Sequence, residues 1–392
     1  MPAIPTALDR PTTAEMLARL VGFDTTSRNS NLPLVGHIRA YLDAHGVPCR
    51  VSTDADGGKA NLHAIIGPPA PGGVALSGHL DTVPVDGQAW TTDPFTLTRR
   101  DGRLVGRGAA DMKGFVASCL AAVPDLKAAG LARPVHLLLT YDEEVSCNGA
   151  RRLIEDMDES GLRPAMCVVG EPSGMQPILA HKGRLAVRLT ARGRTGHSSD
   201  PARGVNAVHA AAEAVAWVAA EARRLAAEGP FEQGFDPPHS TVHVGTFEGG
   251  TILNVIPERA GFVMEWRTIP ADDFFADLRR MEEHVAAAID PAMRAVDPAC
   301  GVSFEVLNWI PGLSLDAGHP LAAAVGQLTG SNSTGKVSYG TEAGLYQVAG
   351  IPTVVCGPGH IRQAHQPDEW IAQSELDACD AFIRRLAARL AA

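Results

Sequence analysis

The sequence predicts an α/β protein in which a larger domain, built on a mostly parallel central sheet, is interrupted by a smaller α+β domain. Three observations lead to this prediction. Short apolar runs alternate with helical patterns over residues 1–180, a strictly alternating pattern begins near residue 180, and the first pattern returns after Pro311. At 392 residues, the chain is also longer than one hydrophobic core usually organises.

The first domain begins with two expected helices. Thr12 or Thr13 can cap the first helix, and the second ends at Gly46. The extended elements expected next are strands at 62–66 and 74–77 and a hairpin at Asp101-Gly102 that joins 95–99 to 104–105. Helices and apolar runs then alternate in the order 113–129, 135–140, 150–157 and 166–169. Apolar runs separated by helices are typical of a parallel sheet that is covered on both faces.

The second domain has the pattern of half-exposed antiparallel strands. Leu185, Val187 and Leu189 face one way, and the residues between them face the other. The other elements expected in this block are a helix at 205–227, strands at 241–247 and 259–266, a helix at 272–288 and a strand at 302–307.

The chain then returns to the first domain with a strand at 354–357 and a final helix to Ala392. To within several residues, we place the limits at 1–180 and 300–392 for the larger domain and at 181–299 for the smaller one.

Composition excludes several classes of function. The net charge is −10 and Lys and Arg form no cluster, so no nucleic-acid partner is expected. No apolar run reaches the roughly 18 residues that a membrane helix needs, so no membrane partner is expected. Residues 1–10 lack the apolar core of a signal peptide, and the seven cysteines contain no Cys-x-x-Cys pair. These features favour a cytoplasmic protein with reduced thiols.

Polar residues that could carry chemistry follow directly after several expected strands. His79 and Asp81 come after the run 74–76 and, two positions apart, can share one face of the chain. A metal-bound imidazole usually has an acid or a carbonyl on its other nitrogen, so Asp81 could support His79 or could touch a catalytic base. Taken alone, the pair would be an incidental part of a surface loop.

Two acidic segments add to this signal. Asp111 lies in a glycine-rich segment ahead of a helix, where it could project into a cleft or simply cap the helix. Glu143 and Glu144 follow the run 135–140. Adjacent acids on an extended segment diverge, so one can bind a metal while the other activates a water. A solvated acidic turn is the alternative.

Two more candidates follow later strands: Glu171 after 166–169 and His365 after 354–357. Because strands of one parallel sheet present their carboxyl ends at the same rim, we expect five residues to converge there, namely His79, Asp111, Glu144, Glu171 and His365. Two imidazoles and three carboxylates suit zinc, with cobalt or manganese as alternatives. One bridging carboxylate would allow two ions.

In order and over nearly the whole chain, these motifs resemble the two-zinc amidohydrolases that include acetylornithine deacetylase, succinyl-diaminopimelate desuccinylase, aminoacylase and glutamate-releasing carboxypeptidases. The resemblance implies a zinc-aminopeptidase-like catalytic domain, a ferredoxin-like dimerisation or lid domain, and hence a homodimer. It implies two Zn²⁺ ions bridged by Asp111, with His79 and Glu171 on one ion and Glu144 and His365 on the other. The peptide after the bridging aspartate is expected to be cis.

The same resemblance implies roles for residues that do not bind metal. Glu143 matches the general base, and Asp81 matches the acid that orients the site. His197, in the segment Gly196-His197-Ser198-Ser199, matches a histidine that reaches the oxyanion from the partner subunit. Asn254 and Arg267 match residues that hold the substrate, Arg267 through a bidentate carboxylate contact. Without the resemblance, Asn254 would be a turn residue and Arg267 a solvated strand end.

The implied reaction is hydrolysis of the N-acyl amide of a small amino acid. The segments 85–90, 179–183 and 340–344 look closest to the acetylornithine deacetylase branch, whereas the desuccinylase branch has an arginine-rich element at 181–183. N-acetylornithine is therefore the first substrate expected. A deformylase, an aminoacylase or a carboxypeptidase is the alternative within the family. A non-catalytic, metal-stabilised binding protein is the contrasting hypothesis, and the retention of Glu143 argues against it.

Overall fold

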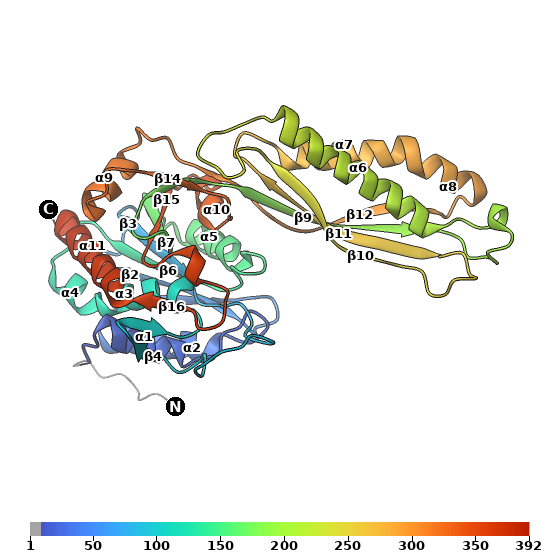
Figure 1. Ribbon diagram of the computed structural model, residues 1–392. Coiled ribbons are helices and arrows are strands. Elements are labelled where there is room, and N and C mark those ends of the chain that lie inside the picture. The colour runs from blue at the N-terminus through green and yellow to red at the C-terminus, as the bar shows by residue number, and fades with distance from the viewer. Residues whose placement is uncertain (1–8, 392) are drawn as a thin grey trace. The chain divides into compact units, whose positions relative to one another are not determined.

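The computed structural model describes residues 9–391, and the chain divides into two compact units (Figure 1). The first unit comprises the described residues up to Ala180, Leu313–Gly335 and the residues from Thr341 onward. The second comprises His181–Gly312 and Lys336–Gly340. Residues 1–8, in the segment expected to carry no signal peptide, and Ala392, the expected end of the last helix, lie outside the described residues.

A mixed sheet forms the centre of the first unit and confirms the predicted fold class. Its spatial order is β1 (Cys49–Thr53), β2 (Ala60–Ile66), β6 (Val135–Thr140), β3 (Val74–His79), β7 (Met166–Pro172), β15 (Thr353–Gly357), β8 (Ile178–His181) and β13 (Leu313–Ser314), and β14 (Gly335–Val337) pairs with β8. The central strands β6, β3, β7 and β15 run parallel. The flanking strands do not: β2 is antiparallel to β6, and β8 is antiparallel to β15.

Helices bury both the sheet and one another. They are α1 (Thr13–Val21), α2 (Leu32–Ala44), η1 (Ala109–Lys113), α3 (Gly114–Ala121), α4 (Val123–Ala128), α5 (Asn148–Ser160), α9 (Pro320–Thr329), α10 (Ala343–Val348), η4 (Ile361–Gln363) and α11 (Gln373–Ala391). The Thr12 hydroxyl accepts from the backbone N–H of Glu15, whose carboxylate accepts from the backbone N–H of Thr12. This capping box confirms the expected start of the first helix.

The helix expected at 113–129 is broken. The break falls between α3 and α4, and Pro124 lies in the first turn of α4. Because proline has no backbone N–H to donate, α3 ends and α4 starts anew at this point. Ahead of the expected helix, Asp111 and Met112 leave helical geometry within η1, and the peptide between them is cis, as the resemblance implied. The expected hairpin turns at Asp101-Gly102, although β4 (Thr98–Arg100) is shorter than predicted; it pairs with β5 (Arg103–Val105), which pairs with β16 (Trp370–Ala372).

The second unit is a four-stranded antiparallel sheet packed on helices. The strand order is β10 (Thr241–Gly249), β11 (Arg259–Thr268), β9 (Gly183–Arg192) and β12 (Gly301–Ile310). The helical elements are η2 (Pro201–Arg203), α6 (Ala207–Glu228), α7 (Phe274–His284), η3 (Val285–Ile289) and α8 (Asp290–Val296). Leu185, Val187 and Leu189 of β9 lie in the core of this unit, as their alternation predicted. Because β12 pairs with β9 along its length, the unit extends to Gly312 rather than ending at residue 299.

Within residues 9–391, none of the helices has both the length and the apolar character needed to cross a bilayer.

Close packing behind the sheet rim provides a stability test at Gly170 of β7. A Cβ atom at this position would lie 2.0 Å from Phe115 Cγ, so we expect Gly170→Ala to destabilise the first unit by about 1–3 kcal/mol. Gly36→Ala is the matched control, because Gly36 is an exposed position in α2 with no neighbouring atom within 4 Å of the added methyl group. It should be neutral or stabilising by up to about 1 kcal/mol. Urea unfolding followed by circular dichroism measures both, and equal stabilities would contradict the packing described here.

Candidate metal centre

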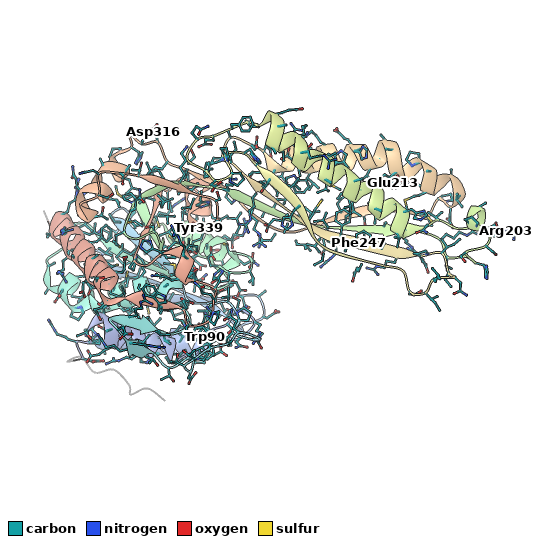
Figure 2. All side chains as sticks on the ribbon, viewed as in Figure 1. Trp90, Arg203, Glu213, Phe247, Asp316 and Tyr339 are labelled. Atoms are coloured by element: carbon teal, nitrogen blue, oxygen red, sulfur yellow. The ribbon has the colours of Figure 1, made fainter. Side chains whose placement is uncertain are left out.

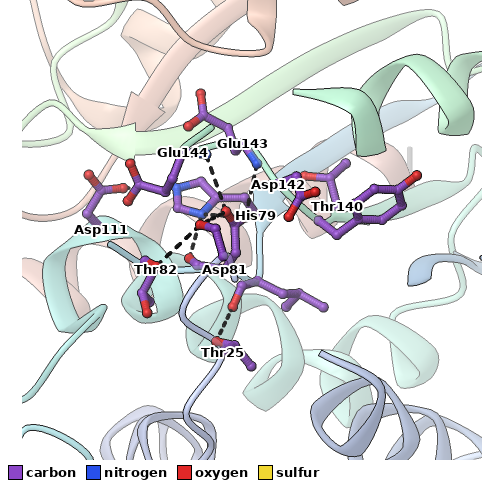
Figure 3. A network of polar contacts seen from close by, with 12 residues as sticks. Thr25, His79, Asp81, Thr82, Asp111, Thr140, Asp142, Glu143 and Glu144 are labelled. Atoms are coloured by element: carbon purple, nitrogen blue, oxygen red, sulfur yellow. Dashed lines mark hydrogen bonds and ion pairs between the residues drawn. The ribbon is translucent and has the colours of Figure 1, made fainter. Parts of the chain in front are cut away.

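The strands β3, β6 and β7 deliver candidate ligands to the rim formed by their carboxyl ends. His79 is the last residue of β3, Glu144 follows β6 by a short turn, and Glu171 lies near the end of β7. Asp111 reaches the same place from η1, and His365 reaches it from the loop after β15. Figure 3 shows His79, Asp111 and Glu144 beside one another. The structure therefore brings together the five residues that the strand ends predicted.

One group of ligand atoms is centred on His79. Its Nε2 lies 3.0 Å from Asp111 Oδ1 and 3.7 Å from Glu171 Oε1, and its side chain is only 1% exposed. Its Nδ1 lies 2.9 Å from the backbone oxygen of Asp81. Since a carbonyl oxygen can only accept, Nδ1 donates to it, and the neutral ring therefore has its proton on Nδ1 and its lone pair on Nε2. This is the tautomer in which His79 can bind a metal through Nε2.

A second group is centred on His365. Its Nε2 lies 3.2 Å from Asp111 Oδ2 and 3.1 Å from Glu144 Oε2. Asp111 thus presents one carboxylate oxygen to each imidazole. Two sets of one imidazole and one glutamate, joined by a shared aspartate, have the composition of a centre for two metal ions.

Burial and mutual repulsion disfavour the charged forms of most carboxyl groups at this site. Burial raises the pKa of Glu143, Glu144 and Glu171. Burial alone would also raise the pKa of Asp111, but hydrogen bonds with the two imidazoles lower it below its usual range. Divalent cations bound among these groups would relieve the repulsion between the carboxylates. The donor set of imidazoles and carboxylates fits zinc, and also cobalt or manganese.

Asp81 holds both the imidazole and the acidic pair. Its carboxylate accepts from the backbone N–H groups of Glu143 and Glu144, at 3.0 and 3.3 Å, and from the Ser27 hydroxyl at 2.7 Å. Its backbone carbonyl accepts from His79. The sequence left open whether Asp81 supports His79 or touches the catalytic base, and the structure shows contacts with both residues (Figure 3). Ligand atoms of Glu143, His79 and Glu171 lie within 4.8 Å of one another.

Sequence reasoning missed two buried glutamates. Glu369 Oε1 accepts from the backbone N–H groups of Ala110 and Asp111, at 2.9 and 3.1 Å, and its other oxygen accepts from Arg107 at 2.7 Å. Glu342 accepts from the hydroxyls of Ser77 and Thr140, at 2.6 and 2.7 Å. Neither follows a strand that the sequence predicted, so the strand-end rule could not find them. The segment 340–344 had served only as an indication of the substrate branch.

The remaining candidates, His197, Asn254 and Arg267, lie in the second unit. His197 forms a bridge to Val255, and the Ser198 N–H donates to the Asn254 carbonyl at 3.2 Å, so two of the three candidate segments are neighbours. The Ser199 N–H donates to His197 Nδ1 at 3.2 Å. A neutral His197 therefore carries its proton on Nε2.

Arg267, expected from the resemblance to hold a substrate carboxylate and without it to be a solvated strand end, is paired with a carboxylate of its own unit. Its Nε and Nη2 donate to Glu265 at 2.7 and 3.4 Å, and Arg184 Nε donates to the same carboxylate at 2.6 Å. The fork of Arg267 thus already holds a carboxylate from its own strand. A second carboxylate would have to share the guanidinium with Glu265 or displace it.

Comparisons of this chain with known proteins agree with one another on its family. Residues 75–389 match the family described as Peptidase family M20/M25/M40. An acetylornithine deacetylase of Myxococcus xanthus is 36% identical over 96% of this chain and 97% of its own length. An acetylornithine deacetylase of Klebsiella pneumoniae strain 342 is 40% identical over 80% of this chain and 79% of its own length. The aminopeptidase PepT of Bacillus cereus ATCC 10987 superimposes with a TM-score of 0.75 at 21% identity, covering 98% of this chain and 100% of that one.

The ion pair between Arg107 and Glu369, which contacts the backbone of Asp111, provides a test of how the residues at the rim are stabilised. The side chains of Arg107 and Glu369 are both 1% exposed, so Glu369→Ala would leave a buried guanidinium unpaired and should cost about 3–5 kcal/mol. Asp158→Ala, which breaks the partly exposed pair with Arg163 in the same unit, is the control and should cost no more than about 1 kcal/mol. Urea unfolding in the presence of a chelator measures both without a metal contribution. Equal losses would show that the buried pair contributes no more than a surface pair.

Proposed function

The chain belongs to peptidase family M20/M25/M40 and is a metal-dependent hydrolase; from this premise we propose that it hydrolyses N-acetylornithine to ornithine and acetate. The observation that carries the hydrolytic part of the proposal is the position of Asp111, whose two carboxylate oxygens face His79 and His365 separately. Two curated relatives named acetylornithine deacetylase, at 36% and 40% identity, support this substrate over others in the family.

We assign five residues to two zinc ions, with cobalt or manganese as substitutes: His79 and Glu171 to one, Glu144 and His365 to the other, and Asp111 to both. When bound, the ions would polarise the scissile carbonyl and lower the pKa of the attacking water. The larger unit is thus proposed as the catalytic domain, and the smaller one as the dimerisation or lid domain.

Glu143 is proposed as the general base. Its backbone is fixed by Asp81, and its carboxylate lies beside His79 and Glu171. From there it would take a proton from the attacking water and return it to the leaving amine. Asp81 would act through position alone, because its own carboxylate is occupied by two backbone N–H groups and by the Ser27 hydroxyl.

His197, Asn254 and Arg267 are proposed as substrate contacts. The protonated Nε2 of His197 suits a donor to the tetrahedral oxyanion. Arg267 would bind the substrate carboxylate by exchanging part of its contact with Glu265. We further propose that these residues act from a partner subunit in a homodimer. The 97% exposure of Leu253, next to Asn254, supports an interface there.

The environment of Lys182 supports a small acyl group. Its ammonium donates to the backbone oxygens of Pro237 and His239, at 2.8 and 2.6 Å. A cation that already donates to two carbonyls of its own unit is poorly placed to bind the second carboxylate of a succinyl group.

We propose a cytoplasmic location, since all seven cysteines are free thiols.

A substrate panel tests the acyl group and the amino acid. The zinc-loaded protein is offered N-acetyl, N-formyl and N-succinyl ornithine, other N-acetyl amino acids and dipeptides. We expect kcat/KM for N-acetylornithine to exceed that for the N-succinyl analogue by about tenfold or more, because a pocket shaped for a small group disfavours a larger one by about 1.4 kcal/mol or more. Preferred cleavage of dipeptides would make the protein an exopeptidase. Metal binding without turnover of any amide would favour a binding protein.

The role of Glu143 is tested by Glu143→Gln, which removes the base while keeping its shape. We expect kcat to fall by about 10²–10⁴-fold, with the zinc content of the protein unchanged. Glu159→Gln, at an exposed position in α5, removes the same charge and should leave kcat unchanged. Zinc content by atomic emission accompanies each rate. Full activity of Glu143→Gln would exclude this residue as the base.

A further inference from the structure

Arg107 is a buried cation at the start of the segment that leads to Asp111. Its side chain is 1% exposed, and it lies on the loop between β5 and η1. Arginine remains charged at all physiological pH values, and its planar head donates in several fixed directions at once. A buried ion pair adds little net stability, because desolvation of the two charges offsets their attraction. The geometry around this guanidinium therefore needs a reason other than stability.

One arm of the guanidinium leads to Asp111. Arg107 Nη1 donates to Glu369 Oε2 at 2.7 Å. The other oxygen of Glu369 accepts from the backbone N–H groups of Ala110 and Asp111. The pair thus fixes the backbone from which the Asp111 carboxylate projects.

The second arm leads to His365. Arg107 Nη2 donates to Gln88 Oε1, and Gln88 Nε2 donates to the backbone oxygen of His365 at 3.1 Å. The indole N–H of Trp90 donates to the same Gln88 oxygen at 2.9 Å, and the guanidinium lies over the Trp90 ring with Cζ 5.0 Å from its centre. Trp90 is labelled on its loop in Figure 2. The Gln88 amide is therefore oriented by two donors before it reaches His365.

His365 is the ligand that most needs such support. Its side chain is 49% exposed, whereas those of His79, Asp111 and Glu171 are 1%, 6% and 5% exposed. It lies outside any helix or strand, and its φ of 61° is in the left-handed region that non-glycine residues rarely occupy. Neither packing nor a regular element holds it, so its backbone depends on contacts such as the one with Gln88.

We propose that Arg107 is a positioning residue that ties together the two halves of the metal centre, holding Asp111 through Glu369 and His365 through Gln88. The proposal rests on the two-metal site assigned above. Its specific consequence is that Gln88, whose hydrogen bond to His365 is with the backbone oxygen, controls affinity for the metal ion proposed at His365 and Glu144.

Gln88→Ala tests the proposal, because it removes the hydrogen bond to the His365 backbone while leaving the ion pair between Arg107 and Glu369 in place. We expect the protein still to bind two zinc ions, with the affinity for one of them lowered by about 10–100-fold, as is usual when a residue supporting a ligand is removed. Titration of the metal-free protein against a chromophoric zinc chelator measures both affinities independently of activity.

Gln347→Ala is the matched control. Gln347 is likewise half-buried, and its amide also joins two segments, accepting from Ser314 N–H at 2.8 Å and donating to Ser314 O at 2.6 Å, in the same unit. It should leave both zinc affinities unchanged. Thermal unfolding of the metal-free variants shows whether either change disturbs the fold.

A double-mutant cycle shows whether Gln88 acts through His365. In a His365→Ala background one zinc site is already lost, so adding Gln88→Ala should not change the affinity for the remaining ion. A further loss in that background, or unchanged zinc binding by Gln88→Ala alone, would overturn the inference while leaving the proposed function intact. Failure of the unaltered protein to bind two zinc ions would overturn both.

Discussion

The carboxylate of Asp111 faces an imidazole on each side, and much of the larger unit serves to keep it there. The two imidazoles come from residues 79 and 365, far apart in the chain, so the site exists only once β3 and β15 lie in one sheet with β7 between them. Four carboxyl groups gathered at this rim repel one another, and their burial raises the free energy of the charged forms. Because these groups repel one another, contacts from the rest of the fold have to hold them in place.

The contacts that hold the site together are made mainly with the backbone of the site residues. Asp81 accepts from the N–H groups of Glu143 and Glu144, Glu369 accepts from the N–H group of Asp111, and Gln88 donates to the carbonyl of His365. In each case a side chain holds the main chain of a ligand or of the proposed base, so the functional carboxylate or imidazole remains available to a metal or a substrate.

The sequence predicted the residues at the rim well but not the buried residues that hold them in place, and the reason is physical. Parallel strands end at one edge, so His79, Glu144 and Glu171 could be placed together from strand positions alone. Glu369 could not be placed, because it precedes β16, a short strand that no apolar run predicts, and because its burial with Arg107 depends on contacts between distant segments. The broken helix at Pro124 and the end of the second unit at Gly312 likewise depend on proline geometry and on pairing partners, which local pattern does not specify.

In the function proposed here, specificity and catalysis depend on different parts of the molecule. The proposed metal ligands and Glu143 are all in the first unit, whereas His197, Asn254, Arg267 and Lys182 are in the second. In that unit, Lys182 is committed to two backbone carbonyls and Arg267 to Glu265, so the charges available to a substrate are fewer than the sequence alone suggests. A shared hydrolytic centre can therefore remain constant while acyl preference changes through the partners of these few cations. For the same reason, the motifs at the rim identify the reaction class more firmly than the substrate.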